Sequence, residues 1–183
     1  MRVNLTNISD LFVVDTNHHI DSRGTFARFF CDDSLKKIVE HRNILQINHS
    51  TSSSIGSIRG LHYQIPPFSE MKLVRCIKGS VWDVAVDIRY GSPSFLKWHA
   101  ELLTSKNSKM MVIPEGFAHG FQVMEKDSEL IYLHTEFYNK DADSGILYDD
   151  EKLSIAWPLP VSNISEKDKC YNKINDEFKG VKI

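Results

Sequence analysis

The sequence predicts an all-β protein built as a small barrel or sandwich. Short runs rich in Val, Ile and aromatic residues recur along most of the chain, and each is bounded by Gly, Pro, Asn, Asp or Ser. Few helical patterns lie between these runs, so the strands should pack against one another. Because 183 residues suit one domain with a sizeable core, we expect a single domain over residues 1–183.

Two segments are typical of short helices at the periphery of such a fold. The first is DDSLKKIVEH, residues 32–41, in which Asp32 or Asp33 can cap the first turn. Its apolar face consists of Leu35, Ile38 and Val39. A second helix can begin after Ser165.

The strand signal is strongest in KLVRCIKGSVWDVAVDI, residues 72–88. Two β-rich runs flank the turn residues Lys78-Gly79-Ser80, which predicts a hairpin. In the second run, one set of residues alternates with another: Val84, Val86 and Ile88 against Asp83, Ala85 and Asp87. Such alternation predicts that the hairpin has one buried face.

Further strands are expected on both sides of this segment. SIRGLHYQ, residues 57–64, is consistent with a buried strand. The later runs are residues 95–103, 110–114, 119–124 and 130–138, with SKNSK at 105–109 as a turn.

Composition and charge narrow the class of protein. The net charge of -2 comes with no basic stripe that could neutralise a run of phosphates, so we expect no nucleic-acid partner. No window approaches the roughly 18 to 20 apolar residues of a membrane-spanning helix, so we expect no membrane partner and a cytoplasmic protein. Cys31, Cys76 and Cys170 are odd in number and far apart, which indicates reduced thiols.

Two histidine-containing segments resemble the motifs of the cupin family, which implies a cupin-like β-barrel or jelly roll. PEGFAHGF, residues 114–121, contains P-x-G-x-x-H, and Lys72 precedes Gly79 at the spacing found in the first cupin motif. Cupins usually bind a metal through two histidines and a glutamate of that first motif and one histidine of the second. Here the first motif reads His62-Tyr63-Gln64, with Lys72 in place of the glutamate. A lysine ammonium would repel a divalent cation, and two histidines alone are too few ligands to hold one. We therefore expect no metal and disfavour a metal-dependent dioxygenase or isomerase.

A closer resemblance extends in blocks over residues 23–168. The segments RGLHYQ, KLVRCIKGSVWDVAVDIRYGSPSF, IPEGFAHGFQV and GILYDDEKLSIAWP are similar, in this order, to the dTDP-4-dehydrorhamnose 3,5-epimerase family. The resemblance implies a homodimeric enzyme of deoxysugar and surface polysaccharide biosynthesis that needs no cofactor. It would invert C3, C5 or both in a nucleotide-linked 4-keto sugar. The C4 ketone acidifies the neighbouring C–H groups, so a base can form an enolate and an acid can return a proton to the opposite face.

The resemblance assigns catalytic roles to four residues. His62 would be the base, because imidazole titrates near neutrality, and Asp168 in SEKD would fix its tautomer. Lys72 would direct its ammonium at the enolate oxygen, and Tyr132 would be the acid on the opposite face. Taken singly, such a histidine or tyrosine is typical of packing in a sheet, and such a lysine of a solvated strand edge.

Further positions match residues around the substrate in this family. Arg23 and Arg59 match arginines near the diphosphate, where guanidinium groups suit phosphate oxygens. His119 matches a residue of the same pocket, although a structural role is the alternative. The expected substrate-binding set is Arg23, Phe26, Arg28, Gln46, Asn48, Arg59, His119 and Tyr138.

Two features depart from the family's pattern. Members that use thymidine carry an acidic residue soon after RGxF, whereas this chain has Ala27-Arg28, and an arginine cannot accept a hydrogen bond from a base N–H. We therefore expect dTDP to bind more weakly than at least one other nucleoside diphosphate, and dTDP, GDP and CDP sugars, including 4-keto heptoses, all stay open. The loop IPPFSEM, residues 65–71, also differs from the short glycine-containing turn expected before Lys72.

A module that binds a nucleotide sugar without turning it over is the alternative on the same barrel. A binding module has no need for a base, an orienting carboxylate, a cation for the enolate and an acid together. The chain carries all four: His62, Asp168, Lys72 and Tyr132. The sequence therefore favours the enzyme.

Overall fold

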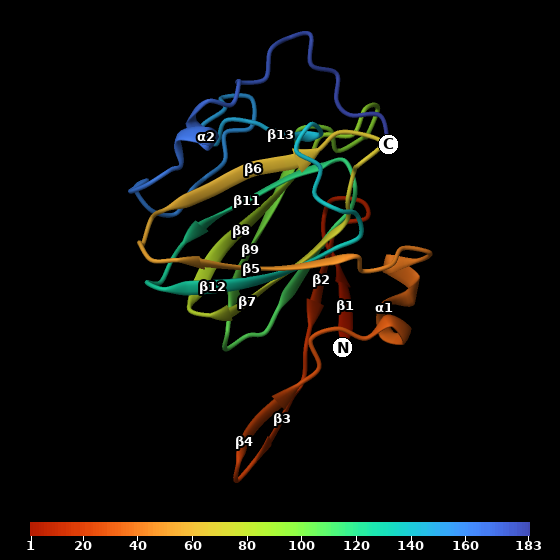
Figure 1. Ribbon diagram of the computed structural model, residues 1–183, viewed down its shortest axis with the longest axis vertical. Helices are drawn as coiled ribbons and strands as arrows, with labels where there is room; N and C mark the ends of the chain where they lie inside the picture. The colour runs from red at the N-terminus through yellow and green to blue at the C-terminus, as the bar shows by residue number, and fades with distance from the viewer.

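The computed structural model describes residues 1–183, and its core consists of two facing antiparallel sheets (Figure 1). The six-stranded sheet consists, in spatial order, of β1 (Arg2–Leu5), β2 (Phe12–Asp15), β10 (Met110–Ile113), β7 (Lys72–Lys78), β12 (Ser128–His134) and β5 (Gln46–Ser52). The five-stranded sheet consists of β13 (Asp143–Gly145), β6 (Ile58–Gln64), β11 (Phe117–Val123), β8 (Ser80–Asp87) and β9 (Trp98–Thr104). The predicted all-β, cupin-like jelly roll is confirmed.

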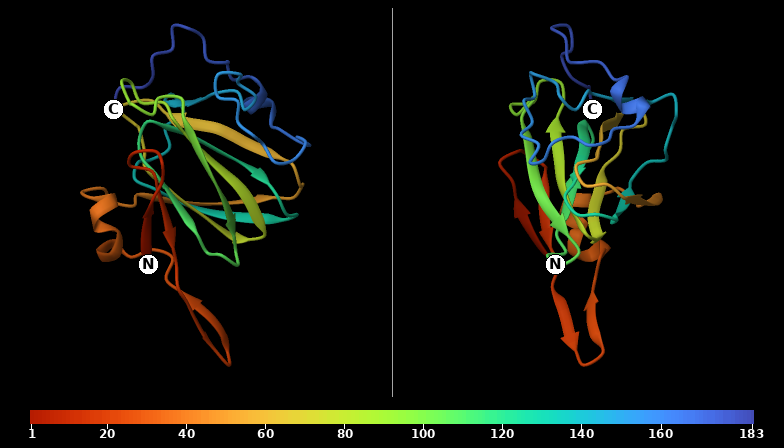
Figure 2. Two further views of the ribbon diagram at one scale, coloured as in Figure 1. Left: turned by 180° about the vertical axis from the view of Figure 1, so that it is seen from behind. Right: turned by 90° about the vertical axis from the view of Figure 1, so that its left-hand side faces the viewer.

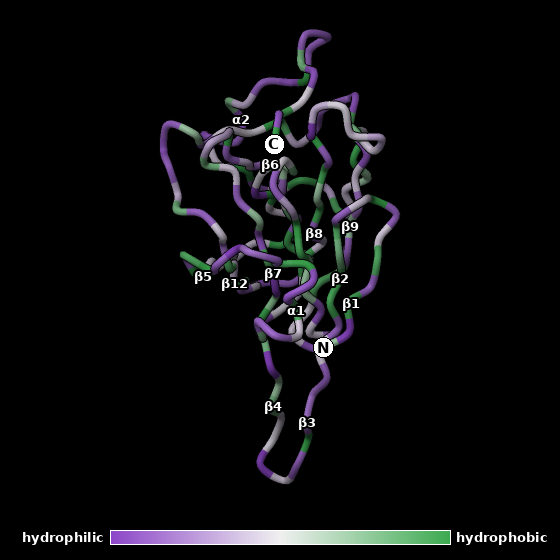
Figure 3. The backbone as a smooth tube through the Cα atoms, turned by 90° about the vertical axis from the view of Figure 1, so that its right-hand side faces the viewer, coloured by the Kyte–Doolittle hydropathy of each residue, from purple (hydrophilic) through white to green (hydrophobic).

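Hydrophobic side chains are buried between the sheets and also outside them. Between the sheets, one cluster joins residues of both, among them Val74 and Phe121. On the outer face of the five-stranded sheet, the C-terminal segment packs Ile146 and Val181 in a cluster with Val86. In the tube coloured by hydropathy, hydrophobic stretches accordingly run along strands such as β8 and β2 (Figure 3).

The prediction of a hairpin over residues 72–88 is wrong. β7 and β8 follow each other in the chain but lie in different sheets, where β7 pairs with β10 and β12, and β8 pairs with β9 and β11. Gly79 between them has a φ of 73°, and a Cβ at this position would lie 2.4 Å from the hydroxyl oxygen of Ser128. Glycine therefore lets the chain pass tightly from one sheet to the other.

β8 is also buried on both faces, and not on one as predicted. Val84 and Val86 belong to the outer cluster, Ala85 belongs to the cluster between the sheets, and Asp83 is 0% exposed. A period of two identifies the residues that share a face but not which face meets water. Here it separates an apolar outer layer from an interior that contains polar groups.

The two predicted helices are confirmed, with one correction. α1 runs over Asp32–Val39, and its N-cap is Cys31, which makes no side-chain capping bond. The prediction that Asp32 or Asp33 caps the helix is wrong, because both lie in its first turn, where carboxylates favour the helix N-terminus. α2 (Glu166–Lys169) begins where the sequence predicted.

The later predicted strands are present, although β12 ends at His134 rather than at residue 138. β1 to β5 and β13 were not predicted, because they are short or, like QINHSTS in β5, polar. The three cysteines are free thiols. No helix has the length and hydrophobicity needed to cross a membrane.

β3 (His18–Asp21) and β4 (Gly24–Ala27) form a separate hairpin, the arm, which projects away from the sheets (Figures 1 and 2). Its apolar side chains Ile20 and Phe26 are 78% and 69% exposed. A two-stranded hairpin is only marginally stable by itself, and exposed apolar groups on it are typical of a contact surface.

The base of the arm is held by a buried arginine. Arg75 donates to the Thr16 hydroxyl at 2.7 Å and to the Phe29 carbonyl at 3.4 Å, and these two residues flank the arm. It also donates to the carbonyl of Ser108. Burial lowers the pKa of Arg75 to about 10. One guanidinium therefore ties both ends of the arm to β7.

Candidate active site

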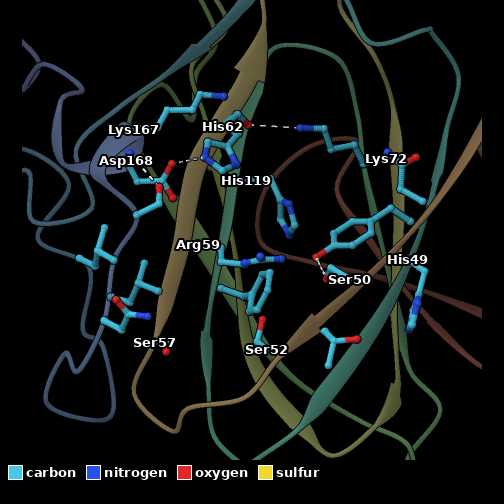
Figure 4. A pocket seen from close by; sticks show the side chains of 18 of the residues that line it. His49, Ser50, Ser52, Ser57, Arg59, His62, Lys72, His119, Lys167 and Asp168 are labelled. Carbon is cyan, nitrogen blue, oxygen red and sulfur yellow. Dashed lines mark hydrogen bonds and ion pairs between the residues drawn. The ribbon is translucent and has the colours of Figure 1, made fainter.

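A cavity of about 580 Å³ lies between the two sheets (Figure 4). β6 and β11 line it from the five-stranded sheet, β5, β7 and β12 line it from the six-stranded sheet, and α2 closes one edge. Only 4 of its 20 lining residues are hydrophobic. Polar groups that converge on a concave interior are typical of a binding or catalytic site.

His62 and Asp168 form a hydrogen-bonded pair at the edge of this cavity. The His62 Nε2 lies 2.8 Å from the Asp168 Oδ1, and the side chains are 34% and 5% exposed. Burial by itself would raise the pKa of Asp168, but its contacts with His62, Gly60 and Ser165 together outweigh this and hold the pKa below the usual value. An ionised carboxylate accepts the Nε2 proton, so Nδ1 is the imidazole nitrogen left to accept another.

Local structure places the Asp168 carboxylate. The Asp168 N–H donates to the Ser165 hydroxyl at 3.1 Å, which caps α2, and the Gly60 N–H donates to Asp168 Oδ2 at 3.0 Å. A Cβ on Gly60 would lie 2.6 Å from the Gly120 Cα and 2.7 Å from the His119 carbonyl oxygen. Only glycine lets β6 and β11 approach this closely while β6 presents an N–H to the carboxylate.

Lys72 and Tyr132 reach the cavity from the opposite sheet. The Lys72 Nζ donates to the His62 carbonyl at 3.3 Å (Figure 4), and the Tyr132 hydroxyl lies 2.9 Å from the Ser50 hydroxyl. Burial raises the pKa of Tyr132 above its usual value, so the phenol keeps its proton at neutral pH.

A second histidine–aspartate pair lies beside the first. β11 places His119 directly opposite His62 on β6, and the His119 Nε2 lies 2.8 Å from the Asp83 Oδ1. The His119 ring centroid is 6.3 Å from that of Tyr132. Asp83 thus gives His119 a fixed orientation next to the phenol.

The structure brings most of the predicted site residues together. The lining includes His62, Asp168, Lys72, Tyr132, Asn48, Arg59 and His119. Gln46 and Tyr138 lie next to this lining, because Gln46 donates to the Asn48 Oδ1 at 3.2 Å and its own Oε1 accepts the Tyr138 N–H at 3.1 Å.

Three predicted residues lie away from the cavity, on the arm or just after it. Arg23 and Phe26 lie on the arm, and Arg23 pairs there with Asp21 at 2.7 Å. Arg28 follows the arm, with its Nη1 3.8 Å from the Cys31 Sγ. A sequence match identifies such residues without indicating where the fold places them.

Several polar residues of the cavity were not predicted from the sequence. Lys167 lines it beside Asp168 (Figure 4) and pairs with Asp143. Its position next to Asp168 in SEKD was the available signal. Asp83 was predicted to be on the open face of its strand, and Ser50 lies in a strand that was not predicted.

The position of the cupin metal has a different chemistry here. Lys72, which replaces the motif glutamate, lies 3.0 Å from a carboxylate oxygen of Glu70. No three His, Cys, Asp or Glu side chains of the structure are grouped so that they could hold a metal ion.

The arrangement suits proton transfer at carbon. An imidazole with an orienting carboxylate can take a proton from a C–H next to a carbonyl, and an ammonium can stabilise the resulting enolate. A phenol from the other sheet can return a proton from the other side. His62, Asp168, Lys72 and Tyr132 supply these groups.

Comparison with known proteins gives consistent matches over nearly the whole chain. The family model for dTDP-4-dehydrorhamnose 3,5-epimerase matches residues 5–176. The enzyme of that name from Shigella flexneri is 41% identical over 169 residues, which is 92% of this chain and 93% of the relative.

Solved structures match equally well. The dTDP-4-dehydrorhamnose 3,5-epimerase of Bacillus anthracis, with TDP and PPi bound, gives a TM-score of 0.91 at 34% identity and covers 94% of this chain and 99% of its own. The dTDP-6-deoxy-D-glucose-3,5-epimerase of Legionella pneumophila, in complex with dTDP-4-keto-L-rhamnose, gives a TM-score of 0.90 at 35% identity. This match covers 94% of this chain and 92% of its own.

Proposed function

Because this chain belongs to the dTDP-4-dehydrorhamnose 3,5-epimerase family, we propose that the cavity between its sheets is where it inverts carbon centres of its substrate. The protein is an epimerase of a nucleotide-linked 4-keto sugar in deoxysugar biosynthesis. The observation that supports the proposed site is that His62 and Tyr132 face one cavity from opposite sheets. Inversion requires a proton to leave one face of a carbon and another to arrive on the other face.

Each catalytic group has a defined task in this proposal. His62 Nδ1 takes the proton from C3 or C5, and Asp168 stabilises the imidazolium through the hydrogen bond to Nε2. The electron pair of the broken C–H bond moves toward the C4 oxygen, where Lys72 stabilises the enolate oxygen. Tyr132 delivers a proton to the opposite face, and a proton from solvent restores the phenol.

The nucleotide would bind through the other cations of the cavity lining. Arg59 and Lys167 both line the cavity, and guanidinium and ammonium groups suit a diphosphate. Asn48 and its neighbour Gln46, both on β5, offer amide groups to the nucleotide.

A direct test is incubation with 4-keto-6-deoxy sugars linked to dTDP, GDP or CDP in deuterated water. Deuterium gain with inversion supports the proposal, whereas binding without deuterium gain would support the non-catalytic module.

Asp168→Asn should slow the reaction without preventing it. The amide keeps the shape of the side chain but cannot stabilise an imidazolium, so we expect kcat to fall by about 10- to 100-fold, with KM little changed. Asp149→Asn is a matched control, because Asp149 is half-exposed and outside the cavity. Steady-state kinetics of both variants checks this, and an unchanged kcat in Asp168→Asn would remove the carboxylate from the mechanism.

Arg28 leads to a prediction about the base. A lost buried hydrogen bond typically costs about 1 to 3 kcal/mol, so we expect dTDP to bind more weakly by this amount than at least one of GDP and CDP. Arg28→Glu should strengthen dTDP binding relative to the other two. Titration calorimetry with the three nucleotides measures both effects, and a clear preference of the unmodified protein for dTDP would contradict the prediction.

The arm supports a homodimer as the working unit. Arg23 and Phe26 match substrate-binding positions, yet they lie on a hairpin that projects away from the cavity of their own chain. A second copy related by two-fold symmetry can receive such an arm and return its own. We therefore propose that each cavity is completed by the arm of its partner.

Complementation between subunits tests this arrangement. Arg23→Ala should inactivate through the arm and His62→Ala through the cavity, so each homodimer should be inactive. A heterodimer of the two variants contains one intact site, and we expect about half of the activity of the unmodified dimer. Co-expression with two affinity tags isolates that heterodimer. An inactive heterodimer would show that the arm serves the cavity of its own chain.

A further inference from the structure

The loop of residues 65–71, which departs from the family's pattern, places the buried carboxylate of Glu70 next to Lys72. The Glu70 Oε1 lies 3.0 Å from the Lys72 Nζ, and the Glu70 side chain is 7% exposed. We propose that Glu70 is a positioning residue, which holds the Lys72 ammonium in the orientation that the enolate oxygen requires. This inference rests on the role proposed above for Lys72.

The donors of the Lys72 ammonium are directed by its neighbours. A lysine ammonium has three N–H groups and can rotate freely at the end of a flexible side chain. In this structure one donor is directed to Glu70 at 3.0 Å and another to the His62 carbonyl at 3.3 Å. The third is left for the cavity, which Lys72 lines. Fixing two donors thus sets the direction of the third.

Glu70 is itself held in place from a second side. The Gln64 Nε2 donates to the Glu70 Oε2 at 2.7 Å and to the Phe68 carbonyl at 2.9 Å, which ties the carboxylate and its loop to the end of β6. Gln64 stands where a chelating strand would carry a second histidine, and here its amide orients a carboxylate. Burial raises the pKa of Glu70, but contacts with His134 and Lys72 outweigh this and keep its pKa below the usual value.

His134 connects the same carboxylate to Asn48, a predicted substrate-binding residue. β12 places His134 directly opposite Lys72 on β7, and the His134 Nδ1 lies 3.6 Å from the Glu70 Oε2. The Asn48 amide donates to the His134 Nε2 at 3.3 Å, because its oxygen already accepts from Gln46. The Nδ1 proton therefore faces Glu70. The carboxylate is shared by two side chains of the cavity wall and has little freedom to move.

Glu70→Gln is the sharpest single change. Glutamine keeps the shape and one acceptor oxygen but loses the charge that orients the ammonium, so we expect kcat for deuterium exchange to fall by about 10-fold or more. KM and the affinity for dTDP should stay within about twofold, because the diphosphate contacts lie elsewhere. Glu70→Asp keeps the charge at a shorter reach and should recover part of the loss. If the glutamine variant folds poorly, kcat of Glu70→Asp is compared with that of the unmodified protein instead.

Glu129→Gln is the matched control. Glu129 also lies between a lysine and a histidine, 3.0 Å from the Lys78 Nζ and 3.0 Å from the His49 Nε2, but it does not line the cavity. Its substitution should leave kcat unchanged. Equal losses in the two glutamine variants would indicate a general effect of losing an ion pair and would overturn the inference.

A double-mutant cycle separates positioning from a merely structural role. If Glu70 acts through Lys72, Glu70→Gln should cause no further loss in a Lys72→Met background. Equal losses in both backgrounds would overturn the inference. If exchange in Lys72→Met is too slow to measure, the single variant decides: a kcat loss at constant KM supports the inference, and a parallel loss of dTDP affinity and thermal stability overturns it.

The unmodified protein distinguishes this inference from the proposed function. Absence of exchange with every 4-keto sugar in the unmodified protein would overturn the proposed function. Full exchange in Lys72→Met would overturn the role of Lys72 and, with it, that of Glu70. Exchange that depends on Lys72 but not on Glu70 would overturn this inference alone.

Discussion

His62→Ala is expected to abolish deuterium uptake from solvent at both C3 and C5 of the substrate. Among the cavity histidines, His62 alone combines a partly exposed ring with a buried carboxylate partner: His119 is 5% exposed, and the Nε2 of the exposed His49 pairs with Glu129, which is not in the cavity lining. Removing a general base typically costs about 10²- to 10⁴-fold in rate. Nucleotide binding should persist, because Arg59 and Lys167 are unchanged. Mass spectrometry of recovered substrate and titration with dTDP measure the two properties separately.

His41→Ala is the control for this experiment. The His41 side chain is 85% exposed and lies outside the cavity, so its removal should change neither exchange nor binding. Undiminished exchange in His62→Ala would exclude His62 as the base. Loss of exchange together with loss of dTDP binding would indicate a damaged cavity rather than a missing base.

Tyr132→Phe is expected to separate exchange from inversion. The phenylalanine ring keeps the packing of β12, and the enolate should still form through His62 and Lys72. Without the phenol, His62 returns a proton mainly to the face from which it removed one. Inversion should therefore fall by about 10-fold or more relative to exchange.

The measurement combines mass gain with product stereochemistry by proton NMR. Tyr90→Phe serves as the control, because Tyr90 is exposed and lies away from the cavity. Inversion at the rate of the unmodified enzyme would mean that Tyr132 only forms a wall of the cavity. The acid would then have to be sought in His119, Tyr138 or a water molecule.

The fold was largely predictable because strand patterns are local. The runs that became β6 to β12 stand out by their β-branched residues and by the turn residues between them. Which strands pair is not a local property, and this is why β7 and β8 were wrongly joined in a hairpin. Nothing in KGSVWD alone reveals that the chain changes sheets at Gly79.

The candidate site was predictable where a motif names the residue, and not where the fold alone provides it. The pairing of His62 with Asp168 spans 106 positions, so only the family resemblance could suggest it. Asp83 and Glu70 belong to no motif used in the prediction, and their roles follow from contacts formed across the cavity. The resemblance named the positions on the arm, but nothing in the sequence indicated that this hairpin projects away from the sheets.

The position of Asp168 so late in the chain has a consequence for biosynthesis of the protein. The strands of both sheets are complete at Gly145, whereas the outer cover of the five-stranded sheet needs Ile174 and Val181. A nascent chain that has emerged only as far as β13 therefore exposes the apolar outer face of β8 and holds His62 without its Asp168 partner. The residues after Gly145 supply both the cover of that face and the carboxylate that pairs with His62. The part of the chain that completes the His62–Asp168 pair is thus also the part that shields this apolar surface.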